Sequence, residues 1–511
     1  MAIERFTERG RKATALCWFA AALTVGVLGA GVMGEGAESS APRAAGRADD
    51  GAFRWFSVPI DVGGLAKGSC GVPVGCAIDF SKMLAELGVA GAVDERTLRL
   101  LRVGGDGKAV ERAVQFEAAA MPRAKRRTLL PGTTEKVSYL AEHPAGRTPT
   151  GVKVAGRLTW IVRDAPEGTA RYRLLFGVRR GGRMIQVPYA PRNLRGFDER
   201  GRATPVRLFP VMQIRPLWPV GGRLHVSESG RRVTTYHVGP TREPAAGDPL
   251  AERRPYLYPV IGPDRVSLTE VGKPHDPTGS HAHHRSVWIA HANVDGHDFW
   301  SRRGGAILHA GFESMADGPL FCRLVHKTRW LAGGRALLAG RRELTVWRAV
   351  PDFRLIDVAI ELSPAGSKAV TLGRTNFGLL AVRVAQSMTV FDGGGEILSA
   401  RGDRNEQGAH TKRAAWIDQS GPVGRGKWGG VAILDHPGNP NHPTAWHCRN
   451  DGWAGASFNM AESTPIQPGR PLKLRYRLVL HRHSAAKANV ARRFEEYRAR
   501  PTVRIGRAKE Q

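Results

Sequence analysis

Short segments in which apolar and polar residues alternate with a period of two recur along most of this chain. Clear examples lie at residues 96–103, 156–162 and 170–178, and again at 472–481 near the end. Because successive side chains of a β-strand point to opposite faces, this period predicts strands with one buried and one exposed face. Strands do not alternate regularly with helices, and no repeat of fixed length appears. The pattern therefore predicts an all-β protein with antiparallel sheets.

The strand pattern falls into two regions, with a proline- and glycine-rich stretch at residues 239–255 near their junction. We expect an N-terminal β-sandwich domain over residues 51–217. We expect a larger antiparallel β-sandwich over residues 218–485, for which a supersandwich arrangement is one suitable form. A closing helix and tail take residues 486–511.

Local signals mark three shorter features. Asp79 is the expected N-cap of a short helix at residues 80–87. Residues 228–230 predict the turn of a hairpin. Ser484 is the expected cap of the closing helix, whose predicted apolar stripe is formed by Val490, Phe494 and Tyr497.

The first 36 residues have the form of an export signal. Basic residues precede an uncharged, mostly apolar run from Ala13 to Met33, and small residues follow it. We expect a cleaved signal peptide at residues 1–36 and a disordered tether at residues 37–50. The alternative is an uncleaved anchor, and only in that case do we expect contact with a membrane.

The formal net charge of +30 invites a nucleic-acid interpretation. We reject it, because the arginines are scattered over strands and loops and form no basic stripe with aromatic residues between them. An arginine-rich composition, or binding to an acidic polysaccharide or anionic surface, remains open. Nucleotide-binding glycine loops and the G-x-S-x-G elbow are also absent from the sequence.

Four cysteines follow the expected signal peptide: Cys70, Cys76, Cys322 and Cys448. Their even number fits an oxidising compartment but is too low for a disulfide scaffold. A local bridge between Cys70 and Cys76 and four free thiols are both compatible with the sequence.

Residues 281–300 concentrate more chemistry than any other segment of the chain. They hold five histidines within 17 residues, together with Arg285, two aspartates and two tryptophans. Imidazole titrates near neutral pH and is the commonest metal ligand. Metal binding, metal-free catalysis or sugar contact, and structural hydrogen bonding are three open interpretations of this cluster.

A metal site within this segment meets a geometric obstacle. If residues 281–291 formed one straight strand, His281 and His291 would lie about 33 Å apart, too far to share an ion. A third ligand would have to come from elsewhere, with His436, His442 or His447 as the best candidates. We therefore predict no tightly bound metal, and the sequence points to no particular cofactor.

A second polar segment follows the apolar run at residues 430–434. Asp435 and His436 stand at the end of this expected buried strand, where a rigid scaffold can present side chains to a cleft. The alternative is a structural turn stiffened by prolines. A weaker third set consists of Tyr256, Tyr258, Pro259 and residues 374–376.

We expect the segments around residues 283 and 435 to face one pocket. The residues expected to act as acid, base or orienting groups are His283, His284, Arg285, Asp298, Asp435 and His436. The residues expected to contact the substrate are Tyr258, Trp288, His291, Asn293, Trp300, Asn439, Trp446 and Arg449.

About half of the chain, residues 250–485, resembles a bacterial family of unknown function. The resemblance rests on RPYLYPVIGP at 254–263, HHRSVW at 283–288, NVDGHDFW at 293–300, LGRT at 372–375, VRVA at 382–385, DHP at 435–437, NP at 439–440, WHCR at 446–449 and RYR at 475–477. It implies an exported bacterial protein associated with carbohydrate catabolism. The N-terminal half resembles no family that we can name.

The family is sometimes labelled methane oxygenase PmoA-like. A membrane oxygenase subunit needs several apolar spans, whereas only the run ending at Met33 is apolar enough here, so we regard the label as a misnomer. The chain also departs from the family pattern. Ser280 and Ala282 stand where an aspartate and a proline are more usual, and Glu270 replaces a common arginine. The missing aspartate weakens any general-base role placed before His283.

Three functions are compatible with the sequence. The first is an exported carbohydrate-active enzyme that uses histidine and aspartate as acid and base, as a hydrolase, lyase or epimerase. The second is a non-catalytic protein that binds carbohydrate or a surface. The third is a metalloprotein with histidine ligands. The expected partner is a carbohydrate or another small polar substrate.

The basic segment and apolar run generate a first prediction: the mature protein is periplasmic or extracellular. N-terminal sequencing of secreted material should give a first residue between Glu35 and Glu38. Recovery of the protein from the cytosol with Met1 intact would contradict this expectation.

Overall fold

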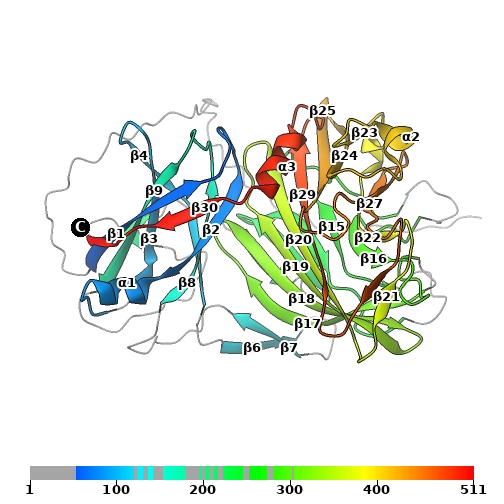
Figure 1. Cartoon of the computed structure of the whole chain (residues 1–511), viewed down its shortest axis with the longest axis horizontal. Coiled ribbons are helices and arrows are strands. Elements are labelled where there is room, and N and C mark those ends of the chain that lie inside the picture. Colours follow the sequence, from blue (N-terminus) through cyan, green and yellow to red (C-terminus); the bar gives the residue numbers. More distant parts are fainter. Residues whose placement is uncertain are drawn as a thin grey trace, which may run out of the picture. The chain divides into compact units, whose positions relative to one another are not determined.

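The structure is a computed structural model, and it describes residues 53–91, 93–119, 124–129, 136–141, 154–179, 195–197, 203–205, 212–216, 222–244, 252–272, 281–301 and 304–511. The expected signal peptide and tether lie outside the described residues. The described residues belong to one compact unit, and they are mostly β-strand, as predicted (Figure 1). No helix in these parts combines the length and the apolar character needed to cross a membrane.

Two sheets make up the N-terminal region. The larger has the strand order β30-β1-β9-β3-β4, with β31 also paired to β1. Its bounds are β1 Phe53–Gly63, β3 Val93–Val103, β4 Ala109–Arg112, β9 Ala170–Arg179, β30 Thr502–Ile505 and β31 Lys509–Glu510. The smaller sheet, in the order β2-β8-β5, comprises β2 Val72–Asp79, β5 Val114–Ala118 and β8 Ala155–Val162. Buried residues from both sheets form one core, as expected for a β-sandwich.

Two eight-stranded antiparallel sheets form the larger region. The first, here called the β16 sheet, has the order β12-β13-β14-β15-β16-β22-β27-β26. Its bounds are β12 Met212–Pro216, β13 Arg223–Glu228, β14 Arg231–His237, β15 Tyr256–Val260, β16 Val287–His291, β22 Gly378–Arg383, β26 Trp446–Arg449 and β27 Trp453–Ala456.

The second eight-stranded sheet, here called the β29 sheet, has the order β17-β18-β19-β20-β29-β25-β24-β23. Its bounds are β17 Ala306–Ala316, β18 Phe321–Ala332, β19 Arg335–Trp347, β20 Phe353–Pro364, β23 Glu396–Ser399, β24 Trp416–Gly424, β25 Lys427–Asp435 and β29 Leu472–Arg482.

Short elements complete the chain. The helices are α1 Phe80–Glu86, η1 Gln386–Met388, α2 Asn405–Ala409 and α3 Val490–Arg498. The two-stranded pairs are β6 Ala124–Leu129 with β7 Lys136–Ala141, β10 Arg195–Phe197 with β11 Ala203–Pro205, and β21 Val370–Leu372 with β28 Thr464–Ile466.

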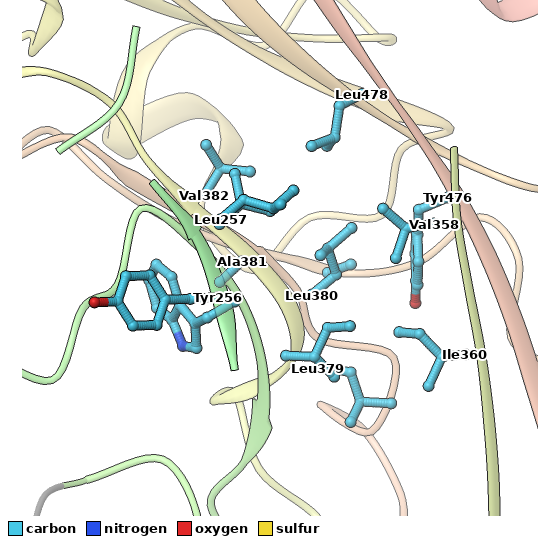
Figure 2. Close-up of a cluster of buried hydrophobic side chains, with 14 of the residues drawn as sticks. Tyr256, Leu257, Val358, Ile360, Leu379, Leu380, Ala381, Val382, Tyr476 and Leu478 are labelled. Atoms are coloured by element: carbon cyan, nitrogen blue, oxygen red, sulfur yellow. The ribbon is translucent and has the colours of Figure 1, made fainter. Parts of the chain in front are cut away.

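The two eight-stranded sheets enclose a common hydrophobic core. Figure 2 shows part of it: residues of β15 and β22 from one sheet, including Leu257 and Leu380, with residues of β20 and β29 from the other, including Val358 and Leu478. All six residues of β22 are buried. Such burial of apolar area is the main favourable contribution to folding, and it fixes β22 as a central strand of the sandwich.

The β29 sheet is buried on both faces over much of its area. Side chains such as Ala432, Leu434 and Val479 belong to the second core, which also contains residues of the N-terminal sheets and of α3. This double burial explains why residues 430–434 form a continuous apolar run instead of alternating.

The local predictions are mostly confirmed. Asp79 caps α1 by accepting a hydrogen bond from the N–H of Lys82, and the hairpin turns between β13 and β14. The predicted cap of the closing helix is wrong: Asn489, and not Ser484, accepts the hydrogen bond from the N–H of Arg492 at the start of α3. The residues after α3 add β30 and β31 to the N-terminal sheet, so β30 (red) runs antiparallel to β1 (blue; Figure 1).

A fully buried ion pair joins β24 and β29 across β25. Asp418 Oδ2 lies 2.6 Å from His481 Nε2, and neither side chain is more than 1% exposed. Gly430 of β25 lies between them, and a Cβ there would come 2.3 Å from the His481 ring. Burial alone lowers the pKa of His481, but the charge and hydrogen bond of Asp418 outweigh it and leave the pKa raised.

This pair generates a prediction about stability. Asp418→Ala leaves a buried imidazole without its counter-charge, and we expect a loss of about 3–5 kcal/mol in the free energy of unfolding at pH 6. Because the folded pKa of His481 is raised, the contribution is fully present below the unfolded pKa. It is lost as the pH rises through the folded value. Urea denaturation at several pH values measures both effects.

Asp352 provides the matched control. It pairs with Arg482 at 3.2 Å at the end of the same strand, but it is 71% exposed. Asp352→Ala should change stability by no more than about 1 kcal/mol. Equal losses in the two variants would contradict the special role of the buried pair.

Candidate functional site

Strand pairing brings together segments that are far apart in the sequence. In the β16 sheet, β22 lies between β16 and β27, and β26 forms the edge beside β27. The turn containing His281–His284 precedes β16, Asn376 and Phe377 precede β22, and the β26–β27 hairpin carries His447 to Trp453. The ends of these strands therefore deliver polar side chains to one place.

A pocket of about 670 Å³ opens where these segments meet. This volume falls within the usual range for small-molecule sites. Its lining residues are His281, His283, His284, Ala292, Asp298, Trp300, Ser301, Asn376, Phe377, His410, His447, Arg449, Asp451 and Trp453. Five of them are histidines, and we call the cavity the histidine pocket.

Aromatic rings form much of its wall. The ring centroid of Trp453 lies 4.2 Å from that of His447, 5.1 Å from that of His284 and 5.5 Å from that of Trp300. Phe377 packs 5.7 Å from Trp300 and 4.9 Å from His447. Mutual packing holds these rings in place, so the wall is formed before any ligand binds.

The His284 ring is uncharged at neutral pH, and one of its two nitrogens accepts a hydrogen bond. Arg383, a buried residue of β22, donates a hydrogen bond from Nη1 to His284 Nδ1 at 3.1 Å. Burial, followed by the positive neighbours His283 and Arg383, lowers the pKa of His284 well below its ordinary value. A neutral ring that accepts at Nδ1 carries its proton on Nε2.

His447 and His410 have the opposite arrangement. His447 Nδ1 lies 3.0 Å from the carbonyl oxygen of Asn376, and His410 Nδ1 lies 3.0 Å from that of Cys448. A carbonyl only accepts, so both rings donate from Nδ1. Burial lowers the pKa of His447 to about 4, which leaves its Nε2 unprotonated at neutral pH. The two rings lie edge to face, 4.7 Å apart.

Two carboxylates complete the polar lining. Asp298 Oδ1 accepts hydrogen bonds from the backbone N–H groups of Trp300 and Ser301, at 2.6 and 3.1 Å. Asp451 Oδ2 lies 3.6 Å from His281 Nε2 and 3.8 Å from Arg383 Nη1. Asp298 is therefore fixed by its own turn, whereas Asp451 stands between a pocket histidine and a buried arginine.

Two buried polar atoms of pocket residues have no hydrogen-bond partner within the described part of the chain. They are the acceptor Asp451 Oδ1 and the donor Trp300 Nε1. Buried polar groups are nearly always paired in native proteins, so such exceptions need an explanation. Both atoms belong to residues that line the histidine pocket.

Five of the residues expected to act as catalytic groups or to contact the substrate line this pocket: His283, His284, Asp298, Trp300 and Arg449. His281, Asn376 and His447, which the sequence analysis considered in other roles, line it too. Other selected residues pack behind the pocket wall or lie beside the pocket. Trp288 is buried and stacks on His284 at 5.3 Å, and His291 is buried with its Nδ1 accepting from the N–H of Asn293. Burial lowers the pKa of His291 to about 4.

Three further selected residues make contacts outside the histidine pocket. Arg285 lies over the ring of Tyr256, at 5.6 Å. The Asn293 side chain accepts from the N–H of Gly296, and the Tyr258 carbonyl pairs with His237 Nε2. None of the three lines the histidine pocket.

Asp435, His436 and Asn439 form a separate cluster beside α3. Asp435 accepts from Asn439 Nδ2, from His442 Nδ1 and from the N–H of Thr444, at 2.7–2.9 Å. Burial raises the pKa of Asp435, and burial lowers that of His436 to about 4. The His436 ring packs against Tyr497 of α3 at 5.2 Å. These residues are absent from the pocket lining.

Trp446 is also buried away from the pocket, with Nε1 donating to the Ala414 carbonyl. Its neighbour His447 lines the pocket instead, because successive residues of β26 face opposite sides. His447, considered from the sequence only as a possible metal ligand, shares one face of β26 with Arg449. No local signal marks His410 or Asp451, which reach the pocket only through tertiary contacts.

His281, His283 and His284 lie in a turn, and the strand begins only at Val287. The straight-strand distance between His281 and His291 therefore does not describe this segment. Among the described residues, no three histidine, cysteine or acidic side chains are grouped so that they could hold a metal ion. All four described cysteines are free thiols.

The fold and pocket define a β-sandwich protein with a preformed polar site. A family model described as "Family of unknown function (DUF6807)" matches residues 223–495, and the chain belongs to this family. The resemblance to a bacterial family of unknown function is thus confirmed, and the match names no activity. No curated protein matches the chain.

Two solved structures from Enterococcus faecalis show limited likeness. One is a protein in the glycosyl hydrolase family 38, at 9% identity and a TM-score of 0.34, with 88% of this chain and 47% of that chain covered. The other is an alpha-mannosidase from strain V583, at 8% identity and a TM-score of 0.34, with 89% and 46% covered. The chain spans about half the length of each of these proteins.

The contact between Arg383 and His284 generates a prediction. Arg383→Met removes a positive neighbour and the donor to Nδ1, so the pKa of His284 should rise toward its ordinary value and the preference for the Nε2–H tautomer should weaken. Nitrogen NMR of labelled histidines measures both properties.

Arg285→Met serves as the control, since Arg285 faces Tyr256 and is not among the causes of the His284 shift. An unchanged His284 titration in Arg383→Met would show that burial alone sets its charge state.

Proposed function

We propose that this chain is an exported enzyme that binds a carbohydrate in the histidine pocket and acts on it by acid–base chemistry. The observation that carries the proposal is the pairing of two neutral imidazoles with opposite tautomers around Trp453. His284 keeps its proton on Nε2 because Arg383 donates to Nδ1. His447 keeps its lone pair on Nε2 because Nδ1 donates to the Asn376 carbonyl.

The two rings have complementary roles. A neutral imidazole N–H can stabilise negative charge that develops on a substrate oxygen, whereas an unprotonated Nε2 can accept a proton. We assign the first role to His284 and the second to His447. Such a pair suits removal of a proton from a sugar hydroxyl or from a carbon beside a carbonyl group.

The rest of the lining favours a sugar-sized polyol. Asp451 Oδ1 and Trp300 Nε1 offer one acceptor and one donor that lack protein partners in the described residues. The electron-rich faces of aromatic rings attract the partly positive C–H groups of a sugar ring. The pocket therefore combines an apolar wall with a small number of fixed polar contacts, the usual form of a specific small-molecule site.

Nearby charges of opposite sign largely balance one another. Arg449 Nε lies 2.9 Å from Glu406 Oε1, and Arg383 lies near Asp451. We therefore favour a neutral saccharide over an acidic one, although the whole chain is strongly basic.

Replacement of the assigned base tests the proposal. His447→Gln should lower kcat/KM by about 10²- to 10⁴-fold, the usual contribution of general acid–base catalysis. Activity of the original protein should fall as the pH drops toward about 4, where His447 becomes protonated. A panel of neutral sugars and glycosides, followed by NMR of the products, provides the measurement.

His237→Gln is the matched control. Burial also lowers the pKa of His237 to about 4, but this residue stacks on Tyr256 outside the histidine pocket. Its replacement should leave turnover within about two-fold, since changes away from the reacting groups have small effects. Equal losses in both variants would point to a general effect on folding.

The rival functions give different results in the same experiments. Binding of sugars without turnover, lost in Trp453→Ala, would identify a non-catalytic carbohydrate-binding protein. Near-stoichiometric zinc, copper or iron in protein purified without a chelator or His-tag, lost in His283→Ala, would identify a metalloprotein.

A further inference from the structure

Two arginines lie side by side on the inner face of the larger N-terminal sheet, at the edge formed by β4 (Figure 1). Arg112 of β4 stands opposite Leu100 of β3, and Leu100 belongs to the core between the two N-terminal sheets. Arg102 lies two residues after Leu100 on the same strand and therefore shares its face. Diagonal neighbours on adjacent strands are within reach of long side chains, so the guanidinium groups of Arg102 and Arg112 lie near each other.

The smaller sheet contributes a third arginine. Arg163 directly follows β8, whose Trp160 ring packs 5.6 Å from that of Tyr172 of β9. The Arg102 guanidinium lies over the same Tyr172 ring, 5.4 Å from its centroid. Burial lowers the pKa of Arg112, and Tyr172 opposes this effect. The charges of Arg163 and Arg102 lower the pKa of Arg112 further, so the three positive charges are close enough to act on one another.

No carboxylate of the described chain balances these charges. The groups that shift the pKa of Arg112 include no acidic residue. Arg102 donates to two backbone carbonyl oxygens, which carry no net charge. Glu111, the neighbour of Arg112, belongs to the opposite face and lies 3.1 Å from Arg99. Asp164 is exposed and is not among the groups that act on Arg112.

A cluster of this kind is complementary to an anion. Like charges repel, and the repulsion is stronger where water is partly excluded. All three arginines are half-buried, so a ligand can reach them while solvent screens them incompletely. The planar fork of a guanidinium matches the oxygen atoms of sulfate, phosphate and carboxylate groups. Three positive charges exceed what one carboxylate neutralises, so a doubly charged sulfate or phosphate group fits them better.

We propose that Arg102, Arg112 and Arg163 form an oxyanion site that binds a sulfate or phosphate group. The site belongs to the N-terminal sandwich, for which the proposed function gives no role, and it does not depend on the histidine pocket. The group is either a free inorganic ion or a substituent of a larger molecule, such as a sulfate ester on a polysaccharide. In both cases the guanidinium groups donate charge-assisted hydrogen bonds to its oxygens.

Calorimetric titration of the full chain with inorganic sulfate and with inorganic phosphate, at constant ionic strength in chloride buffer, tests the site. The original protein should bind one ion of at least one kind. Arg112→Gln should weaken this binding by about 10- to 100-fold, the range expected for loss of a hydrogen bond to a charged group.

Arg173→Gln is the matched control. Arg173 follows Tyr172 in β9, so it lies on the opposite face of the same sheet, and its side chain is exposed. The replacement removes the same charge from the chain. It should change sulfate or phosphate binding by no more than about two-fold, because exposed charges away from the site are screened.

Unfolding temperatures separate an anion site from a structural role. Without sulfate or phosphate, Arg112→Gln removes like-charge repulsion, so its Tm should equal or exceed that of the original protein. The bound anion should raise the Tm of the original protein and of Arg173→Gln more than that of Arg112→Gln. This comparison removes the general stabilising effect of sulfate, which all three proteins share. A lower Tm of Arg112→Gln with unchanged anion binding would identify a structural arginine and overturn the proposal.

Dextran sulfate and neutral dextran identify the source of the anion. Tighter binding of dextran sulfate, per sulfate group, than of inorganic sulfate supports a site for a sulfated polymer, provided that Arg112→Gln abolishes the difference and neutral dextran lacks it. Equal or weaker binding supports a site for the free ion. The inference is overturned if neither ion and no dextran sulfate binds, or if Arg112→Gln and Arg173→Gln have equal effects. His447→Gln should leave anion binding unchanged, so a failure of this site is distinguishable from a failure of the proposed function.

Discussion

The candidate site depends on one buried arginine. Arg383 lies at the end of the central strand β22. Its guanidinium donates hydrogen bonds to His284 Nδ1 and to the Asp451 carbonyl, and its backbone N–H donates to the Ser286 carbonyl. It thereby connects the turn before β16 to the turn between β26 and β27. A buried guanidinium is costly unless it is hydrogen-bonded, and the two turns supply the acceptors for its Nη1 and Nη2.

The same contacts set the protonation of the pocket. A donor such as Arg383 leaves the neutral His284 ring with its proton on Nε2, and a carbonyl such as that of Asn376 leaves His447 with its lone pair there. Burial keeps both rings uncharged. Identical side chains thus acquire opposite hydrogen-bonding character from two different partners: Arg383, which does not line the pocket, and Asn376, which does. Surroundings can in this way give two groups of one chemical type different properties.

Much of the fold follows from local patterns in the sequence. Period-two alternation predicted strands such as β8, β9 and β29, and Asp79 predicted the start of α1. The site was only partly predictable, because strand order is a long-range property. Nothing local places β22 between β16 and β27, and that order brings residues 284, 376 and 447 together. Asp435 ends a buried strand as expected, but this end packs near α3, which its neighbours in the sequence do not reveal.

The pairing of β30 with β1 has a consequence for biosynthesis. β1 begins at Phe53 and β30 ends at Ile505, so the edge of the N-terminal sheet is completed only after almost the whole chain has left the ribosome. Until then, one side of β1 presents unpaired backbone groups, which can pair with another chain. If export occurs in the unfolded state, the sheet closes only after translocation. The residues of β30 thus cover the exposed edge of β1, a strand that is synthesised much earlier.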